Sequence, residues 1–334
     1  MRQVVLERPR SVVLREAVPP VPGPGEALVR LRCGGICGSD LSAFRGTSPL
    51  VSYPRVLGHE LLVDVEACPE RPELAGRRAV VEPLLPCGRC RACRRGRYNC
   101  CVHLRVMGVH VDGGLADAAA VGLRQLHLVP ESMPDDVAVL AEPVSIAHHA
   151  VQRSGAEAGQ VAVVFGAGTI GLLIAHLLVR ARGCRALVID VDPWRLEVAE
   201  RAGATALQGD AAALRAAVAA ATGGELADLV FEATGHAACT ALTTELVAHA
   251  GRIVLIGWNR GPTAVDTVAL MRKEVDLLGS RNSADAFPAV LRLLAGGLVD
   301  PALLITHRFP LQEAAQALGL LDAGGAGALK VLIA

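Results

Sequence analysis

Four cysteines between positions 87 and 101 could hold a metal ion. Cys87, Cys90, Cys93 and Cys101 are separated by two, two and seven residues in the segment CGRCRACRRGRYNCC. Four thiolates at such spacings can surround one zinc ion tetrahedrally, which leaves no position for a substrate. We therefore interpret the segment as a closed, structural zinc site. Zinc-ribbon binding of nucleic acid is disfavoured, because the segment lacks two separated CxxC pairs and interleaved aromatic residues.

A second group of potential metal ligands flanks this segment in the sequence. Cys37 lies in CGGICGSD, the pair His59 and Glu60 in LGHE, and Glu142 in LAEPVSIAHHAV. A thiolate and an imidazole are a partial ligand set for a catalytic zinc, at which water or substrate fills the remaining position. Glu142 is the best candidate for a third, carboxylate ligand. Each residue alone has a plain structural explanation, but the whole group favours an open metal site.

A glycine-rich turn indicates a dinucleotide site. The segment GAGTIG directly follows the apolar run VAVVF and begins a helical pattern; its key positions are Gly166, Gly168, Ile170 and Gly171. Glycines in such a turn permit the tight bend and the close approach of a pyrophosphate, which binds at the positive N-terminus of the helix.

Asp190 indicates which dinucleotide binds. It ends the next predicted strand, where a carboxylate accepts hydrogen bonds from an adenosine ribose and repels a 2′-phosphate. We therefore expect NAD rather than NADP. For Arg195, three interpretations stay open: a position over the adenine, an ion pair with Asp190, or a plain surface charge of a helix.

The elements that must position these residues change along the chain. Residues 1–148 carry short β-type runs between many Gly and Pro residues, which predicts a partly open barrel or sandwich. From residue 161 onward, strands such as VAVVF, ALVID, DLVFEATG, RIVLIG and VDLLGS alternate with helices, which predicts a doubly wound parallel sheet. We predict an α/β protein with a β-rich zinc-binding catalytic domain (1–148), a Rossmann NAD-binding domain (149–285) and a C-terminal segment (286–334) that returns to the catalytic domain.

Composition disfavours several classes of partner. The 33 Lys and Arg residues balance the 33 Asp and Glu residues, so no net charge attracts nucleic acid or an anionic membrane. The longest apolar stretch is well short of the about 20 residues that span a bilayer, and the first residues lack the apolar core of a signal peptide. We expect a cytoplasmic protein whose ten cysteines are thiols or metal ligands. Lysine occurs only at 273 and 330, which we attribute to coding bias.

Taken together, these segments resemble the zinc-dependent medium-chain alcohol dehydrogenase family. The matching pieces are CGGICGSD, GHE, CxxCxxCxxGxxNxC, GVHVDGG, GAGTIG and the stretch from Asp190 to Arg195, in family order over essentially the full length. The Glu of AEP in place of a cysteine is most similar to the branch of polyol (sorbitol-type), threonine and sugar-acid dehydrogenases. The resemblance implies a GroES-like catalytic domain and two zinc ions per chain. It also implies a homodimer or homotetramer that pairs through the edge strand RIVLIG and the segments after it.

The resemblance also implies roles for single residues. Cys37, His59 and Glu142 would hold the catalytic zinc, Glu142 directly or through water, and Glu60 would be an adjacent, exchanging carboxylate. Asp40 would orient His59, as metal-bound imidazoles usually require. The zinc would lower the pKa of a bound secondary alcohol, whose carbon then passes a hydride to the nicotinamide.

One departure from the family concerns the path of the alcohol proton. Ser39 lies where the family places a relay hydroxyl, but Ser42 stands where many relatives carry a histidine. The proton would therefore leave through water, Ser42 or another group. His110, in GVHVDGG, is a candidate for a role in the cleft.

The leading hypothesis is an NAD-dependent dehydrogenase acting on a secondary hydroxyl of a polyol, sugar or sugar acid. One alternative is oxidation of an amino-acid alcohol, as in L-threonine 3-dehydrogenases. Another is a catalytically silent NAD-binding protein, which predicts only one zinc ion per chain.

Overall fold

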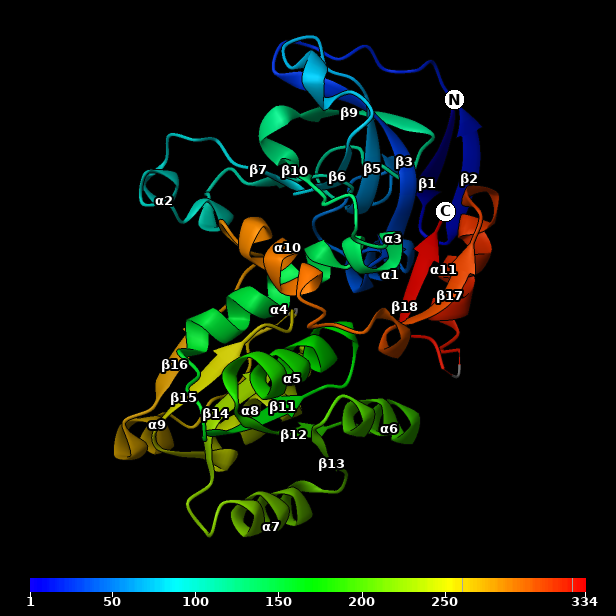
Figure 1. Ribbon diagram of the computed structural model, residues 1–334. Coiled ribbons are helices and arrows are strands. Elements are labelled where there is room, and N and C mark those ends of the chain that lie inside the picture. The colour runs from blue at the N-terminus through cyan, green and yellow to red at the C-terminus, as the bar shows by residue number, and fades with distance from the viewer. Residues whose placement is uncertain (260, 326) are drawn as a thin grey trace. The chain divides into compact units, whose positions relative to one another are not determined.

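The computed structural model describes residues 1–259, 261–325 and 327–334, which divide into two compact units (Figure 1). Unit 1 comprises Met1–Glu142 and Phe287–Ala334, and unit 2 comprises Pro143–Ala286. The first division falls inside helix α4 (Ala141–Ser154). The sequence predicts this domain border at residue 148. A change of composition could not mark the observed border, because helix α4 is continuous across it. Among the described residues, no helix has the length and apolar character needed to cross a membrane.

A seven-stranded sheet forms the body of unit 1, in the order β10-β6-β5-β3-β18-β17, with β9 also paired to β3 (Figure 1). Its strands are β3 (Glu26–Ile36), β5 (Glu60–Ala67), β6 (Arg78–Val81), β9 (Ala118–Gly122), β10 (Leu126–Leu128), β17 (Ile305–Phe309) and β18 (Lys330–Ile333). On β3, buried and more exposed residues alternate up to Arg32, and the residues from Cys33 to Ile36 are all buried. The chain therefore enters the interior of unit 1 just before Cys37.

Smaller elements complete unit 1. They are the sheet β2 (Ser11–Glu16), β1 (Arg2–Arg8) and β4 (Arg55–Val56), the pair β7 (Leu84–Leu85) and β8 (Arg105–Val106), helices α1 (Gly38–Phe44), α2 (Arg91–Arg94), α3 (Asp135–Ala138), α10 (Phe287–Ala295) and α11 (Ala314–Asp322), and short 3-10 turns η1 (Pro72–Leu74), η2 (Tyr98–Cys100), η3 (Leu123–Gln125), η4 (Pro301–Leu303) and η5 (Leu311–Glu313). Residues from both ends of the chain share one apolar core, for example Leu6, Leu61, Leu318 and Val331.

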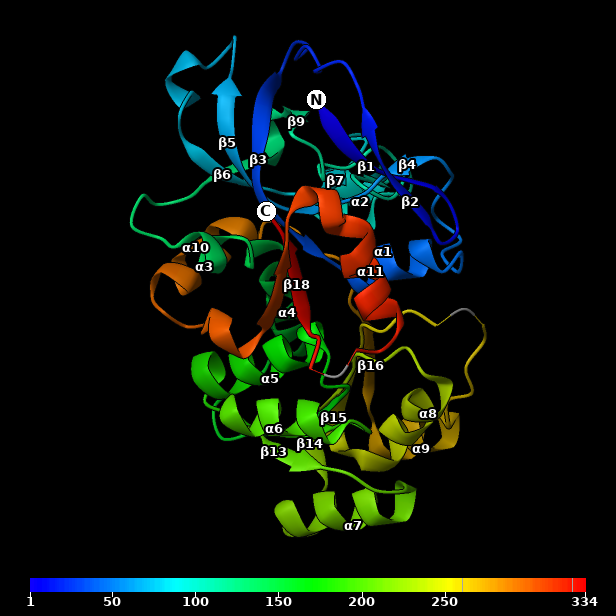
Figure 2. The same ribbon diagram turned by 90° about the vertical axis from the view of Figure 1, so that its right-hand side faces the viewer.

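Unit 2 contains the predicted parallel sheet, in the order β13-β12-β11-β14-β15-β16 (Figure 2). Its elements are β11 (Val161–Phe165), α5 (Thr169–Arg182), β12 (Arg185–Ile189), α6 (Pro193–Arg201), β13 (Thr205–Leu207), α7 (Ala211–Ala221), β14 (Ala227–Glu232), α8 (Ala237–Leu246), β15 (Val247–Leu255), α9 (Thr267–Lys273) and β16 (Asp276–Gly279). Figure 2 shows α5 and α6 on one face of the sheet and α8 and α9 on the other. The strand order reverses between β11 and β14, where sheets of this type bind ligands.

The edge of this sheet differs from the prediction. RIVLIG belongs mainly to β15, which pairs with β14 on one side and with β16 on the other. The strand at the edge is β16, from the later run VDLLGS. Both runs are short and apolar, so their sequences alone could not reveal which one has a neighbour on each side.

Candidate active site and metal centres

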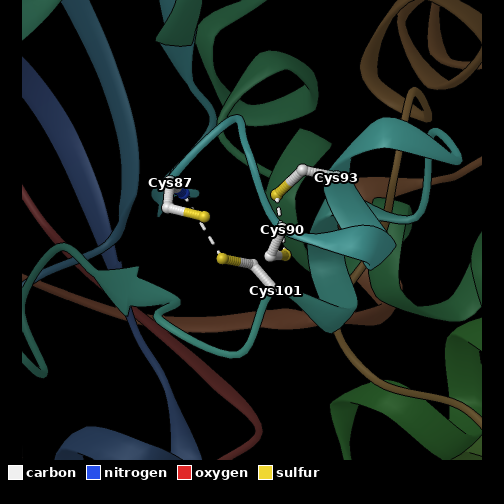
Figure 3. A group of neighbouring side chains, drawn as sticks. All are labelled: Cys87, Cys90, Cys93 and Cys101. Carbon is white, nitrogen blue, oxygen red and sulfur yellow. Dashed lines mark hydrogen bonds between the residues drawn. The ribbon is translucent and has the colours of Figure 1, made fainter.

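The four cysteines of residues 87–101 point toward one another (Figure 3). Their sulfur atoms all lie within 4.8 Å of one another. The backbone N–H of Cys87 donates to the sulfur of Cys101 (3.3 Å), and the sulfur atoms of Cys90 and Cys93 are 3.4 Å apart. Backbone N–H groups of Cys93 and Val102 lower the pKa of Cys90 to about 6, whereas desolvation raises the pKa of Cys93 to about 12. Four sulfur donors at these separations fit a closed zinc site.

A buried carboxylate attaches this cysteine lobe to the large sheet. Glu82, which follows β6, accepts a hydrogen bond from the hydroxyl of Tyr98 (2.8 Å), and its second oxygen lies 3.1 Å from Nε2 of His127. The ring of His127 stacks on Phe287 of α10 with centroids 4.8 Å apart. Sequence reasoning missed these residues, because nothing in the local pattern links Glu82 to Tyr98.

Cys37, His59 and Glu60 lie close together, at the end of strand β3 and the start of strand β5. Cys37 follows β3 directly and β5 begins at Glu60, while β3 and β5 run antiparallel with Gly35 opposite Glu60. One potential ligand atom from each of Cys37, His59 and Glu60 lies within 4.8 Å of the others. A thiolate, an imidazole and a carboxylate at these separations fit a zinc ion that keeps one position open.

Helix α1 brings two further polar groups to His59. Asp40 accepts a hydrogen bond from the backbone N–H of Cys37 (2.9 Å), and its other oxygen lies 3.7 Å from Nδ1 of His59. The hydroxyl of the exposed Ser39 lies 3.3 Å from Nε2 of His59. Burial alone would lower the pKa of His59, but Asp40, Cys37 and Glu142 raise it well above its usual value. A buried imidazole in such anionic surroundings suits a site for a divalent cation.

Glu142 lies in the first turn of α4 and is buried, but it is outside the compact group of three ligands. Burial raises the pKa of Glu142 to about 7, and the charges of His59, Glu60, Lys330 and Asp40 also act on it. The structure therefore places Glu60, rather than Glu142, within 4.8 Å of the ligand atoms of Cys37 and His59. Glu142 is near enough to share their electrostatic environment.

Lys330 is a residue of this site that sequence reasoning did not select. It is the first residue of β18, and its side chain is 4% exposed. Its Nζ donates to both carboxylate oxygens of Glu60, at 2.7 and 2.6 Å. The available signal was that 33 basic residues include lysine only at 273 and 330. The coding bias accounts for the arginines but not for this buried lysine.

Ser42, a candidate for the proton path beyond Ser39, and His110, the candidate for a role in the cleft, both have local partners. The hydroxyl of Ser42 donates to the carbonyl of Gly38 within α1 (3.0 Å). Nδ1 of His110 accepts a hydrogen bond from the backbone N–H of Val106 (3.1 Å). Ser39 is therefore the predicted relay group that the structure brings to His59.

In unit 2, the loop between β11 and α5 has the backbone of a pyrophosphate site. Gly166 has a φ of +94°, and a Cβ on Gly171 would lie 1.8 Å from the carbonyl oxygen of Gly166. Gly168 caps α5, and Ile170 is half-buried in the first turn of that helix. These glycines have the backbone geometry that lets a pyrophosphate approach the N-terminus of a helix.

Asp190 fixes this loop from the end of β12. Its carboxylate accepts hydrogen bonds from the backbone N–H groups of Ala167 (2.6 Å) and Asp192 (2.9 Å). Arg195 forms an ion pair with Asp192 (3.4 Å). The pairing of Arg195 with Asp190, one of its three interpretations, is therefore not what the structure shows.

Comparisons with known proteins agree with both units. Residues 23–131 match the model of the alcohol dehydrogenase GroES-like domain, and residues 158–296 match that of the zinc-binding dehydrogenase domain. The chain is 35% identical to L-galactonate-5-dehydrogenase of Escherichia coli K12, covering 95% of this chain and 94% of that protein. It is also 35% identical to D-altritol 5-dehydrogenase of Agrobacterium fabrum, over 92% of each.

A solved structure is similar over the same extent. It is the alcohol dehydrogenase RspB of Escherichia coli CFT073, determined with the cofactor NADH, with a TM-score of 0.95 and 34% identity over 100% of this chain and 98% of that one. The predicted resemblance and fold class are thereby confirmed. The chain belongs to the zinc-dependent medium-chain alcohol dehydrogenase family, in its polyol and sugar-acid branch.

Proposed function

We propose that this protein is a zinc-dependent dehydrogenase that transfers a hydride between NAD and a secondary hydroxyl of a polyol, sugar or sugar acid. The observation that carries the proposal is the buried group of Cys37, His59 and Glu60, with its mixed sulfur, nitrogen and oxygen donors. Two relatives at 35% identity are named as 5-dehydrogenases of a sugar acid and of a polyol, which supports the substrate class.

Two sets of residues would hold the two zinc ions. Cys87, Cys90, Cys93 and Cys101 would hold the structural ion, and Cys37 and His59 with a carboxylate, Glu142 or Glu60, would hold the catalytic one. When bound, the catalytic zinc supplies a Lewis acid that lowers the pKa of an alcohol, and NAD supplies the hydride acceptor.

The protein's own groups orient the site and move the proton. Asp40 faces Nδ1 of His59, which leaves Nε2 for the metal. The hydroxyl of Ser39 lies beside Nε2 and is exposed, so it can accept the alcohol proton and pass it to water. In unit 2, Gly166, Gly168, Ile170 and Gly171 would form the pyrophosphate loop, and Asp190 would face the ribose and favour NAD over NADP.

A substrate panel tests this function. The purified protein would be assayed with NAD and sorbitol, D-altritol, L-galactonate, other hexonates and L-threonine, with zinc counted per chain. We expect turnover of polyols or sugar acids and two zinc ions. Turnover of threonine alone would assign an amino-acid alcohol dehydrogenase, and NAD binding with one zinc and no turnover would assign a silent binding protein.

We also infer a cytoplasmic homodimer or homotetramer. The edge strand β16 and the helix before it present exposed apolar side chains, including Leu277 and Met271. A second copy of the chain could pair with this edge, and light scattering of the purified protein tests that. All ten cysteines are free, as expected in a reducing compartment.

A further inference from the structure

Glu232 is a buried carboxylate of unit 2 that takes no part in the candidate metal sites. It is the last residue of β14 and is 1% exposed. Among the described residues, its carboxylate accepts hydrogen bonds from the backbone N–H groups of Thr234 (2.8 Å) and Gly235 (3.0 Å) and from the hydroxyl of Thr234. These donors carry no net charge, so they orient the carboxylate without neutralising it.

Glu232 joins two loops at the carboxyl edge of the parallel sheet. Its carbonyl accepts hydrogen bonds from the N–H groups of Ile256 and Gly257, just beyond β15, each at 2.9 Å. A Cβ on Gly257 would lie 2.0 Å from the backbone nitrogen of Gly235 and 2.6 Å from Oε2 of Glu232. The carboxylate therefore lies between the ends of β14 and β15, in a space that a side chain at position 257 would fill.

The same carboxylate lies close to the glycine-rich loop. A Cβ on Gly166 would lie 2.9 Å from Cγ2 of Thr234, whose N–H and hydroxyl bind Glu232. The backbone N–H of Ala233 donates to the carbonyl of Phe165 (3.0 Å), the residue before that loop. Only Thr234 therefore stands between Gly166 and the charge of Glu232.

The strand order indicates which part of the cofactor would lie near Glu232. The sheet runs β12-β11-β14-β15, and ligands of such sheets lie across the carboxyl ends where the order reverses, between β11 and β14. Asp190 would hold the adenosine end at β12, and the loop of Gly166 would hold the pyrophosphate at β11. The nicotinamide end would then extend toward β14, which ends at Glu232.

We propose that the negative charge of Glu232 makes the cofactor site discriminate between the two oxidation states of NAD, in favour of the oxidised form. The nicotinamide ring is positively charged in NAD⁺ and neutral in NADH, so a buried anion near the ring stabilises NAD⁺ alone. During alcohol oxidation, the weaker relative binding of NADH would aid release of this product. The inference rests on the proposed function, since it concerns the same cofactor site.

Glu232→Gln removes the charge and keeps the hydrogen bonds. Oε1 accepts from both Thr234 and Gly235, whereas Oε2 only shares the N–H of Gly235 (3.1 Å), so an amide oxygen in the place of Oε1 retains every donor. Calorimetric titration with NAD⁺, NADH and ADP-ribose gives three dissociation constants. We expect NAD⁺ to bind about tenfold more weakly to this variant. NADH, whose ring is neutral, and ADP-ribose, which has no nicotinamide, should bind as they do to the wild type.

Two control variants separate the charge from its position and from its contacts. Asp228→Asn removes a carboxylate near the opposite end of the same strand, where Asp228 accepts a hydrogen bond from the N–H of Val161 (2.7 Å). This variant should leave all three dissociation constants unchanged. Glu232→Asp keeps the charge but shortens the side chain, so it should weaken NAD⁺ and NADH alike and preserve the ratio of their dissociation constants.

Several results would overturn the inference. An unchanged ratio of the NAD⁺ and NADH dissociation constants in Glu232→Gln would make Glu232 a structural support of its loops only. If Glu232→Gln does not fold, the smaller neutral variant Glu232→Ser takes its place. Failure of both to fold, while Glu232→Asp folds, would make the charge a requirement of folding and not of discrimination. A wild-type protein that binds neither NAD⁺ nor NADH would instead refute the proposed function.

Discussion

The two candidate metal sites of unit 1 are assembled in different ways. The cysteine lobe takes all its ligands from residues 87–101, and only Cys101 among them is fully buried. The second site gathers Cys37, His59 and Glu60 from two strand ends, with Lys330 from a third strand near the end of the chain. The lobe needs little more than its own segment, whereas the second site exists only after the sheet has formed.

The two sites also differ in their electrostatics. In the lobe, backbone N–H groups lower the pKa of Cys90 to about 6, whereas desolvation raises the pKa of Cys93 to about 12, so only some of its thiols are prepared as thiolates. In the second site, burial raises the pKa of Glu142 to about 7, and a cation already pairs with Glu60. The lobe offers its metal sulfur ligands only. In the second site the potential ligands include buried carboxylates, of which Glu60 is paired with Lys330.

The largest effect that would test this comparison is the loss of a lobe thiolate. In Cys90→Ser we expect the lobe to lose its zinc and unfold locally, because structural zinc contributes on the order of 10 kcal/mol in small zinc domains. Metal analysis should find one zinc per chain, and calorimetry a clearly lower melting temperature. Cys100→Ser, at an exposed cysteine of the same lobe, is the matched control and should retain two zinc ions. Two zinc ions in Cys90→Ser would contradict the assignment.

The second site should respond in the opposite way. Cys37→Ser removes a ligand of the catalytic ion, whose Lewis acidity contributes several kcal/mol, so turnover should fall by about 10³-fold. The melting temperature should change little, and NAD binding measured by calorimetry should persist. Full turnover in Cys37→Ser would show that the metal chemistry lies elsewhere.

The sequence predicted those parts of the molecule whose signals are local. VAVVF, ALVID and the core of DLVFEATG are continuous apolar runs, as expected for strands buried on both faces, and each became a strand of the parallel sheet. The cysteine lobe could also be predicted, because its four potential ligands lie close together in the chain. Cys37 and His59 were selected as one set, and the structure brings them together.

The parts that were missed depend on pairing between distant segments. Lys330 is 270 positions from Glu60, and only the order β5-β3-β18 brings them together. Gly35 lies opposite Glu60 in this sheet, and a glycine has no side chain from which a sequence pattern could reveal that position. The choice of Glu142 as the third ligand, with Glu60 as an adjacent carboxylate, stays a prediction, and no local pattern in the sequence shows that β5 begins beside Cys37.

The smallest expected effect tests how far the cysteine lobe depends on its contact with the large sheet. Tyr98→Phe removes the hydrogen bond to the buried carboxylate of Glu82 and should lower the free energy of unfolding by about 1–3 kcal/mol. Tyr53→Phe is the matched control, because the only other tyrosine donates to a neutral carbonyl, that of Ala43, and should cost less. Chemical denaturation measures both, and metal analysis should find two zinc ions in each. If Tyr98→Phe lost the lobe zinc, the lobe would depend on the sheet as strongly as the second site does, and the contrast between the two sites would fail.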